Sequence, residues 1–319
     1  MNIRLVKHSE LDNAAWDNCI EKAVNGNIYG FSWYLDIVCE EWDALITEDY
    51  ETVFPLTHRE KFGIRYLYQP FFAQQLGIFS IRHITPEIVE AFLTAIPKKY
   101  LLAEINLNAY NKPDKKKWQV TENLNHELDL IEPYSITKKN YSQNTSRNIA
   151  KAMNHSISIS SNIKPEDIVT MFRQNKGKQI SHLRDHDYRR FIRLAYECIV
   201  NNKAICYGAY TAQNSLCAGA IVVFSHRKAV FLFSATNEIA RENSAMFLLI
   251  DHFIQDLSGN HLTLDFEGSN DPNLARFYKS FGSVRIKYPG LRFNRLPLPV
   301  KFLLRIYKKT KTLTQQFLK

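Results

Sequence analysis

The sequence contains little glycine, proline or cysteine and no long hydrophobic segment. Eleven Gly and eleven Pro among 319 residues argue against a collagen-like, linker-rich or disordered chain. No apolar run approaches the roughly 18 residues that a membrane-spanning helix needs. The charged residues near the N-terminus are followed by no apolar stretch, which is unlike a signal peptide. We therefore expect a globular, cytoplasmic protein.

Several short signatures are also absent. The five cysteines include no Cys-x-x-Cys pair and their number is odd, so the sequence predicts neither a disulfide framework nor a zinc site. It contains no Gly-x-Gly-x-x-Gly and no Gly-x-x-x-x-Gly-Lys-Ser/Thr loop, which excludes nucleotide sites of those types. It also lacks the Gly-x-Ser-x-Gly motif of many serine hydrolases. We expect no metal and no tightly bound cofactor.

Acidic residues are missing from the segment 297–319. The formal net charge is +9, and residues 1–296 account for only +3 of it. The cations of the segment alternate with apolar residues such as Phe302, Ile306 and Phe317, which predicts a basic amphipathic helix. Such a helix either packs its apolar side on the protein or binds peripherally to an anionic membrane, here at the inner face.

The second half of the sequence shows the clearer pattern of secondary structure. β-branched and aromatic residues predict a three-strand meander, and apolar residues at helical spacing predict the helix after it. The predicted elements are strands 204–211, 217–225 and 229–235, helix 243–257, strand 262–266, helix 271–280 and strand 283–288, preceded by helices 163–174 and 187–201. This order indicates an α+β unit with a mixed, mostly antiparallel sheet flanked by helices.

The first half has a similar but looser order. Its predicted elements are strands 42–46, 52–58 and 64–68, helix 86–95, and strands 100–106 and 125–130. Thr85 and Pro86 suit the start of that helix. A basic helix or helix pair over 134–153 then connects the halves. We interpret the chain as the same unit used twice, in domains 1–135 and 136–296, followed by the helix 297–319.

The stretch 264–282 gives the clearest indication of chemistry. Asp265 and Glu267 lie on one face of a predicted strand where the strand ends, and Tyr278 lies on the next helix. Side chains at such a position are often site residues. As a base, Glu267 would accept the proton of an attacking amine. The alternative is that both carboxylates form the solvated face of the strand and that Tyr278 packs its ring on the sheet.

The segment 273–282, Asn-Leu-Ala-Arg-Phe-Tyr-Lys-Ser-Phe-Gly, resembles the last-helix motif of the GNAT superfamily of N-acyltransferases. In that family a tyrosine at the position of Tyr278 commonly protonates the departing thiolate of coenzyme A. The doubled unit, the sequence Asp265-Phe-Glu-Gly and the inter-domain run 141–151 are similar to the Fem-type branch. That branch has two GNAT-like domains and is typified by peptidoglycan aminoacyltransferases that use aminoacyl-tRNA.

The resemblance implies two GNAT-like domains in tandem, a degenerate first one and a second one with the active site. It implies catalytic roles for Tyr278, Glu267 and Asp265. It also implies a donor site, because GNAT proteins place Arg/Gln-x-x-Gly-x-Gly/Ala before the cofactor helix, where bare backbone N–H groups hold a pyrophosphate. The implied cofactor-binding residues are Ser234, Ala235, Thr236, Arg241, Ser244, Ala245 and Asn273.

This sequence departs from the family pattern in two places. In the donor loop, Arg241 fits the first position, but Ser244 and Ala245 are merely small and Met246 does not fit the last position. The sequence also lacks the long helical arm of the Fem enzymes of Gram-positive wall synthesis. Acyl-coenzyme A and aminoacyl-tRNA therefore both stay open as donors.

Two further groups of residues each have a structural and a functional interpretation. Gln69, Gln74 and Gln75 lie in an otherwise apolar and aromatic stretch, where their amides either bond to loop backbone or line a polar substrate pocket. The cations of the connecting segment form either a solvated face or a clamp for phosphates of a tRNA backbone. These cations are Lys138, Lys139, Arg147 and Lys151. With the glutamines, Arg147 is the candidate substrate-binding residue.

Two functions follow from these expectations. The first is an N-acyltransferase or aminoacyltransferase that moves an acyl group from a thioester or an aminoacyl-tRNA to a small-molecule or peptide-like amine. Transfer would proceed by direct attack, since the sequence shows no activated Cys or Ser for a covalent intermediate. The second is a non-catalytic binding module that keeps the fold and has lost the donor site.

Overall fold

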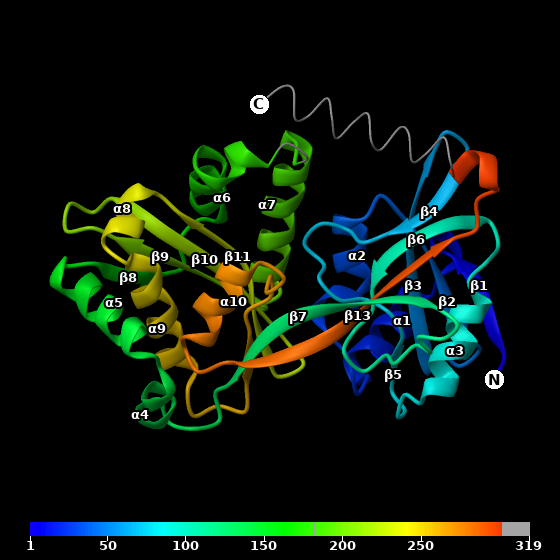
Figure 1. Cartoon of the computed structure of the whole chain (residues 1–319), viewed down its shortest axis with the longest axis horizontal. Coiled ribbons are helices and arrows are strands. Elements are labelled where there is room, and N and C mark those ends of the chain that lie inside the picture. The colour runs from blue at the N-terminus through cyan, green and yellow to red at the C-terminus, as the bar shows by residue number, and fades with distance from the viewer. Residues whose placement is uncertain (181–182, 302–319) are drawn as a thin grey trace.

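The computed structural model describes residues 1–180 and 183–301. Within them the chain is an α+β protein with a large mixed sheet flanked by helices, as the sequence predicts (Figure 1). None of the described helices is long and apolar enough to cross a membrane. Of the predicted helix 297–319, only a first turn that begins at Leu298 lies within the described residues. Its packing and its membrane contact stay predictions.

The first half begins with elements that the sequence pattern did not predict, namely a strand and two helices. Its elements are β1 (Ile3–Lys7), α1 (Asn13–Lys22), the short 3-10 helix η2 (Ile28–Gly30), α2 (Ser32–Val38), β2 (Glu41–Thr47), β3 (Thr52–Lys61), β4 (Ile64–Tyr68), β5 (Phe79–Ser80), α3 (Pro86–Ala95), β6 (Tyr100–Asn106) and β7 (Gln119–Asp129). The predicted cap of α3 is confirmed, since the Thr85 side chain accepts a hydrogen bond from the Ile88 N–H.

The second half follows the predicted order closely. Its elements are α4 (Tyr134–Thr137), α5 (Gln143–Asn154), β8 (Ser158–Ser161), α6 (Pro165–Gln174), α7 (Asp185–Val200), β9 (Ala204–Tyr210), β10 (Leu216–Ser225), β11 (Lys228–Thr236), α8 (Glu238–Glu242), α9 (Ala245–Leu257), β12 (Thr263–Asp265), α10 (Pro272–Lys279) and β13 (Val284–Asn294). The basic connection over 134–153 is a helix pair, α4 and α5, as expected.

The two halves repeat one strand arrangement. In the first half β1, β2, β3 and β4 form an antiparallel meander, and β4 pairs in parallel with β6. In the second half β8, β9, β10 and β11 form the same meander, and β11 pairs in parallel with β12. The connection from β4 to β6 contains α3, and the connection from β11 to β12 contains α9, as parallel pairing requires a crossover.

The halves exchange their last strands and so share one continuous sheet. β7 pairs with β12 of the second half, β13 pairs with β6 of the first, and β7 and β13 pair with each other in the centre (Figure 1). Both strands are longer than the predicted 125–130 and 283–288, because their mutual ladder sets their length rather than apolar alternation. The residue ranges 1–135 and 136–296 stay a prediction, since each gives a strand to the other.

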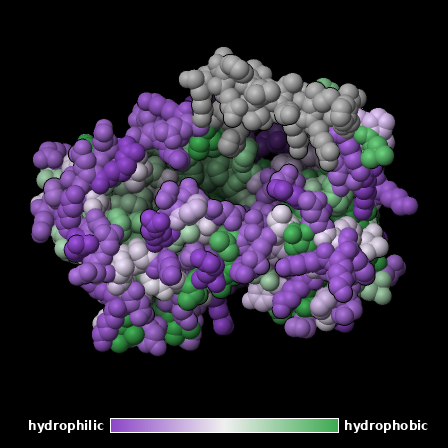
Figure 2. Space-filling view, in the orientation of Figure 1, coloured by the Kyte–Doolittle hydropathy of each residue, from purple (hydrophilic) through white to green (hydrophobic). Residues whose placement is uncertain are grey.

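A hydrophobic cluster also joins the halves. It contains Trp16 and Tyr34 of the first half and Phe191 and Val230 of the second. α2 packs on α7, and the rings of Phe72 and Phe191 lie 4.5 Å apart. On the face shown in Figure 2, the surface between the halves is hollowed, and the visible wall of the hollow is largely hydrophobic. The two units therefore pack as one body rather than as beads on a linker.

Candidate active site

The parallel pair of the second half opens into a gap. β11 pairs with β12 only from Lys228 to Val230, because β12 ends at Asp265. Among the described residues, the rest of β11, through Thr236, has strand pairing only with β10. The predicted donor residues Ser234, Ala235 and Thr236 lie on this one-sided stretch. Its free edge offers backbone N–H and C=O groups beside the end of β12, where an extended ligand can be bound.

A strained turn after β12 places Glu267 in this gap. Glu267 has a φ of 53° and Gly268 a φ of 57°, so two consecutive residues adopt the left-handed conformation. A non-glycine residue rarely adopts it, and such strain concentrates at functional sites. The turn is fixed by the Glu267 N–H, which donates to Asp265 Oδ1 at 3.0 Å, and by Ser269 Oγ, which donates to the Glu267 carbonyl at 2.9 Å.

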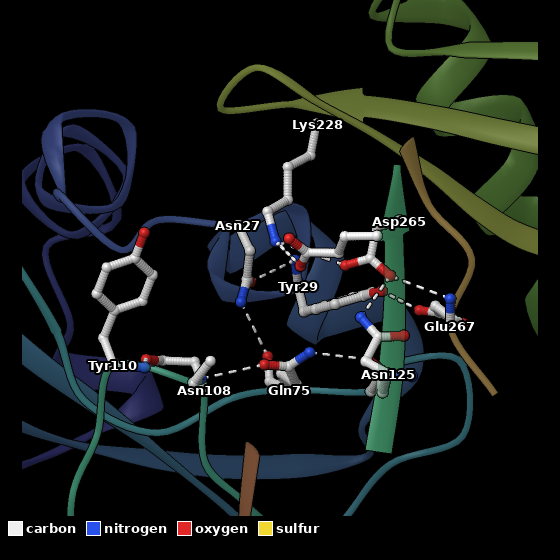
Figure 3. A network of polar contacts seen from close by, with 12 residues as sticks. Asn27, Tyr29, Gln75, Asn108, Tyr110, Asn125, Lys228, Asp265 and Glu267 are labelled. Atoms are coloured by element: carbon white, nitrogen blue, oxygen red, sulfur yellow. Dashed lines mark hydrogen bonds and ion pairs between the residues drawn. The ribbon is translucent and has the colours of Figure 1, made fainter. Parts of the chain in front are cut away.

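The Glu267 carboxyl group meets Tyr29 of the first half (Figure 3). The hydroxyl of Tyr29, on η2, donates a hydrogen bond to Glu267 Oε1. Burial raises the pKa of Glu267 to about 8; the bond from Tyr29 opposes this shift, and the charge of Asp265 adds to it. Burial also raises the pKa of four tyrosines, and the charge of Glu267 contributes to each shift. These four are Tyr29, Tyr34, Tyr278 and Tyr288.

Asp265 is held in a separate ionic network. Its Oδ1 accepts from Asn125 Nδ2 at 2.7 Å, and its Oδ2 lies 3.6 Å from Lys228 Nζ. Lys228 Nζ also lies 2.5 Å from Glu127 Oε1. Burial would lower the pKa of Lys228, but the carboxylates of Asp265 and Glu127 outweigh it and leave this pKa raised. Asp265 is therefore engaged by Asn125 and Lys228, whereas burial raises the pKa of Glu267 to about 8.

Tyr278 lies on α10 beside the same gap. Its ring stacks on Phe266 at 4.7 Å and meets Phe231 edge-on at 6.4 Å. The residue is 6% exposed, and its hydroxyl has no hydrogen-bond partner among the residues that the structure describes. Burial and the charge of Glu267 raise its pKa. The ring thus packs as the structural interpretation expects, and its hydroxyl is not engaged by any described residue.

The predicted pyrophosphate loop is hydrogen-bonded to a neighbouring helix. Ser244 adopts a left-handed conformation before α9, and its hydroxyl donates to Asn148 Oδ1 on α5 at 2.7 Å. Ala245 is fully buried, and Arg241 is exposed on α8. α5 packs on α9, and Ser244 makes no side-chain cap hydrogen bond to the first turn of α9.

A cavity of about 600 Å³ lies next to this loop instead. Of the predicted donor residues, only Asn273 lines it. Its walls come from the start of α5, the first turn of α9 and one face of α10, and they are formed by Ser142, Asn144, Phe247, Asn273, Arg276, Phe277, Lys279 and Ser280. Arg276 and Lys279 have no ion-pair partner within the described part of the chain. Phe247 and Phe277 meet edge-to-face at 4.9 Å.

The predicted glutamines lie in the first half, away from this cavity. Gln69 Nε2 donates to the Ala73 carbonyl at 2.5 Å, and its Oε1 accepts from the Asn106 N–H at 2.8 Å. Gln75 donates to Gln74 Oε1 at 2.8 Å and accepts from a backbone N–H. These contacts follow the loop-backbone interpretation. Their link to Glu267 is indirect, through the loop that carries Tyr29 (Figure 3).

The connecting helices present an exposed basic surface. All four predicted cations are exposed, and none has an ion-pair partner among residues 1–180 and 183–301. They are Lys138, Lys139, Arg147 and Lys151. The same described residues contain no group of three or more His, Cys, Asp or Glu side chains placed to hold a metal ion. All five cysteines are free and buried.

Sequence reasoning missed the residues that complete the Glu267 site. Tyr29, Tyr288, Lys228 and Asn125 belong to different strands and loops, and none lies in a recognisable motif. The only local signal was Asn27, which accepts from the Tyr29 N–H as an N-cap and thereby indicates a short helix. Such contacts depend on the exchanged strands, which the pattern did not reveal.

Comparison with known proteins identifies the fold. No family model and no curated protein sequence matches the chain. Its structure is similar to that of FemX, with a TM-score of 0.64 and 11% identity over 95% of this chain and 99% of FemX. It is similar to a conserved protein of unknown function from Bacteroides thetaiotaomicron, with a TM-score of 0.58 and 9% identity over 88% and 97%. It is also similar to L-PGS from Bacillus licheniformis, with a TM-score of 0.53 and 10% identity over 92% and 95%.

At these identities the likeness shows the fold alone. The chain has the two-unit GNAT-like fold of the Fem type, so the fold implied by the segment 273–282 is confirmed. The donor, the acceptor and the catalytic residues must be inferred from the side chains at the site, because one fold can host many functions.

Proposed function

We propose that the protein is a transferase that moves an acyl or aminoacyl group to an amine by direct attack. The observation that carries the proposal is the Glu267 carboxyl group, which has a pKa of about 8 and lies at the open end of the parallel pair. A group that titrates near neutral pH is suited to general acid–base catalysis. FemX and L-PGS share the fold, and the Fem-type enzymes that the sequence resembles perform this class of reaction.

The residues divide the proton transfers between them. The amine nitrogen attacks the donor carbonyl carbon, and a C–N bond forms as the bond to the leaving sulfur or oxygen breaks. Ionised Glu267 accepts the proton of the attacking nitrogen. The hydroxyl of Tyr278 gives a proton to the leaving group. N–H groups on the free edge of β11, near Ser234, stabilise the negative charge that develops on the carbonyl oxygen.

The cavity beside α10 supports a donor with a phosphate-bearing nucleotide end. Arg276 and Lys279 supply unpaired positive charge for phosphates, and Phe247 and Phe277 supply faces on which a base stacks. The hydrogen bond from Ser244 to Asn148 at the start of α9 argues against a pyrophosphate held there, as GNAT proteins hold that of coenzyme A. The exposed cations of α4 and α5 add further phosphate contacts. We therefore propose aminoacyl-tRNA as the donor ahead of acyl-coenzyme A.

The test is a transfer assay on the full chain. Acetyl-coenzyme A, a long-chain acyl-coenzyme A and a pool of aminoacyl-tRNAs are each incubated with a panel of primary amines, and amide products are identified by mass spectrometry. Glu267→Gln is the negative control. We expect product from aminoacyl-tRNA in the wild type and none in the variant. Product from coenzyme A donors alone would contradict the donor assignment, and equal product from the variant would contradict the role of Glu267.

A non-catalytic binding module is the second candidate. The hydrogen bond from Ser244 to Asn148 favours it, because this bond engages the loop before α9 that typically contacts the donor in the family. Such a module would be stabilised against heat by a donor analogue without consuming it, by about 2.7 kcal/mol at a concentration 100 times Kd. Binding without turnover of any donor would favour the module over the enzyme.

A further inference from the structure

We propose that Tyr29 is a positioning residue through which the first half of the chain orients the Glu267 carboxylate and favours its ionised form. The inference rests on the proposed function of Glu267 as a base. It assigns the first half, which has no open strand pair of its own, a direct part in the active site. The contact that supports the inference is the hydrogen bond from the Tyr29 hydroxyl to Glu267 Oε1, which joins residues 238 positions apart.

The backbone around Tyr29 is fixed on the first half. Asn27 Oδ1 accepts from the Tyr29 N–H at 3.1 Å, and Asn27 Nδ2 donates to the Gln75 carbonyl at 3.0 Å. On the other side of Tyr29, the Gly30 carbonyl accepts from Trp16 Nε1 at 2.8 Å. Trp16 is fully buried on α1. The short helix η2 is therefore held from both ends by first-half residues.

The ring of Tyr29 is fixed as well. It meets the ring of Tyr34 edge-to-face, with centroids 5.6 Å apart. Tyr34 is fully buried on α2, and its hydroxyl donates to the Phe72 carbonyl. Burial and the nearby Glu267 charge raise the pKa of Tyr29, so its hydroxyl keeps its proton and acts only as a donor to Glu267. A donor held this firmly can orient the acceptor that it meets.

The other groups around Glu267 do not replace this bond. Besides Tyr29, the titratable groups that interact electrostatically with Glu267 are Asp265 and three tyrosines, namely Tyr34, Tyr278 and Tyr288. Lys228 is engaged by Glu127 and Asp265, and the charge of Asp265 disfavours ionisation of Glu267. The Tyr29 hydroxyl is the one side-chain donor to the Glu267 carboxyl group among the described residues.

A hydrogen bond that favours the charged form lowers a carboxyl pKa. The bond from Tyr29 thus offsets part of the rise in the Glu267 pKa that burial causes. Since Tyr29 belongs to the first half and Glu267 to the second, the packing of the halves sets the strength of the base. A shift of η2 away from β12 would break this bond, raise the pKa of Glu267 and lower the fraction of Glu267 that is ionised at neutral pH.

The first test needs no substrate. The Glu267 carboxyl band is assigned by infrared difference spectra of wild type minus Glu267→Gln and is then titrated in Tyr29→Phe. We expect the midpoint to rise by about one pKa unit, the size of shift that loss of one hydrogen bond to a charged group gives. Tyr196→Phe removes an exposed hydroxyl that bonds to Glu166 and is the control, with an unchanged midpoint. An unchanged or lower midpoint in Tyr29→Phe would overturn the proposal.

A second variant covers the case in which the hydroxyl deletion perturbs packing. Asn27→Ala leaves Tyr29 in place but removes its cap, so η2 loosens and the Glu267 midpoint should rise by less than in Tyr29→Phe. A fall in the midpoint of a folded Asn27→Ala variant would also count against the proposal.

The third measurement uses turnover, once a substrate is established. In Tyr29→Phe the rise of kcat with pH should move to higher pH with the Glu267 midpoint, while KM for the donor changes little. Raising the pH should therefore restore much of kcat. A loss of kcat that is equal at every pH would indicate a merely structural role and overturn the proposal. Because the infrared titration is independent of turnover, a wrong donor or acceptor cannot be mistaken for a wrong role of Tyr29.

Discussion

The two halves of the molecule use the same strand arrangement and treat its open end in opposite ways. In the first half β4 pairs with β6 along its length, up to Tyr68 at the end of β4. The loop after β4 is then paired with the residue that follows β6 by a parallel bridge between Leu76 and Leu107. In the second half β11 continues beyond β12 without that partner. One half is closed by backbone pairing, and the other keeps a free edge beside an ionisable group.

The side chains at the two strand ends differ in the same sense. In the first half the end is filled by amides: Asn111 accepts from the Ile78 N–H at 2.8 Å, and Asn111 and Asn108 both donate to the Ile78 carbonyl. Gly77 has a φ of 95°, and a Cβ there would lie 2.2 Å from Asn111 Oδ1. Amides cannot take up a proton, whereas Glu267 can. The duplicated unit thus ends in hydrogen-bonded amides in one copy and in an ionisable carboxyl group in the other.

Removing the base should have the largest effect. Glu267→Gln should lower kcat by about 10²–10⁴-fold, since the amide cannot accept the proton of the amine. Raising the pH should not restore the rate. Glu122→Gln, which changes an exposed carboxylate paired with Lys287, is the control. A Glu267→Gln variant with near wild-type kcat would abolish the distinction between the two halves.

Removing the proton donor should have a smaller effect. Tyr278→Phe keeps the ring that stacks on Phe266, so folding and donor binding should be retained. We expect kcat to fall by about 10²-fold, with the donor Kd unchanged, because only proton delivery to the leaving group is lost. Tyr196→Phe, at an exposed hydroxyl, is the matched control. Wild-type turnover in Tyr278→Phe would remove Tyr278 from the mechanism and leave the fold intact.

The raised pKa of Glu267 predicts how stability depends on pH. The folded chain holds this proton up to about pH 8, whereas the unfolded chain releases it near the ordinary value of 4.5. The free energy of unfolding should therefore contain a contribution that is present below pH 4.5 and is lost as the pH rises to 8, by at most about 5 kcal/mol. Glu267→Gln should flatten this part of the profile. Chemical denaturation of both proteins across this pH range measures the difference, and equal slopes would contradict a buried, raised Glu267.

Opening the closed half should cost stability and leave the chemistry unchanged. Asn111→Ala leaves the buried Ile78 N–H without its acceptor, which should lower the free energy of unfolding by about 1–3 kcal/mol. Transfer activity below the melting temperature should stay close to wild type. Asn2→Ala, at an exposed amide, is the control. A large loss of kcat in a folded Asn111→Ala variant would show that the first half takes part in catalysis at its own strand end.

The sequence predicted the local elements better than their arrangement. The strands of the second half, the cap of α3 and the Asp265, Glu267 and Tyr278 stretch could be read from residue patterns within a few positions of each other. The beginning of the chain was missed, because α1 has only Trp16, Cys19 and Ile20 as buried residues and so a weak apolar period.

The contacts of the site could not be predicted in the same way. β7 is mainly polar, and the alternation of Val284, Ile286 and Tyr288 in β13 predicts a strand but not its partner, so the exchange itself left no local signal. Tyr29 reaches Glu267 because the exchanged strands and the shared hydrophobic cluster hold the halves together. No local pattern encodes a contact between residues so far apart in the chain. The hydrogen bond that Ser244 makes at the start of α9 likewise depends on Asn148 of a separate helix.

The most direct test of the account is the midpoint at which the Glu267 carboxyl group ionises in the folded wild-type protein. Infrared difference titration against Glu267→Gln measures it without a substrate. A midpoint near pH 8, well above the ordinary value of 4.5, is the predicted result, because the group is buried at the open strand end beside Asp265. A midpoint near 4.5 would mean an ordinary solvated carboxylate and would contradict the assignment of this strand end as the reaction site.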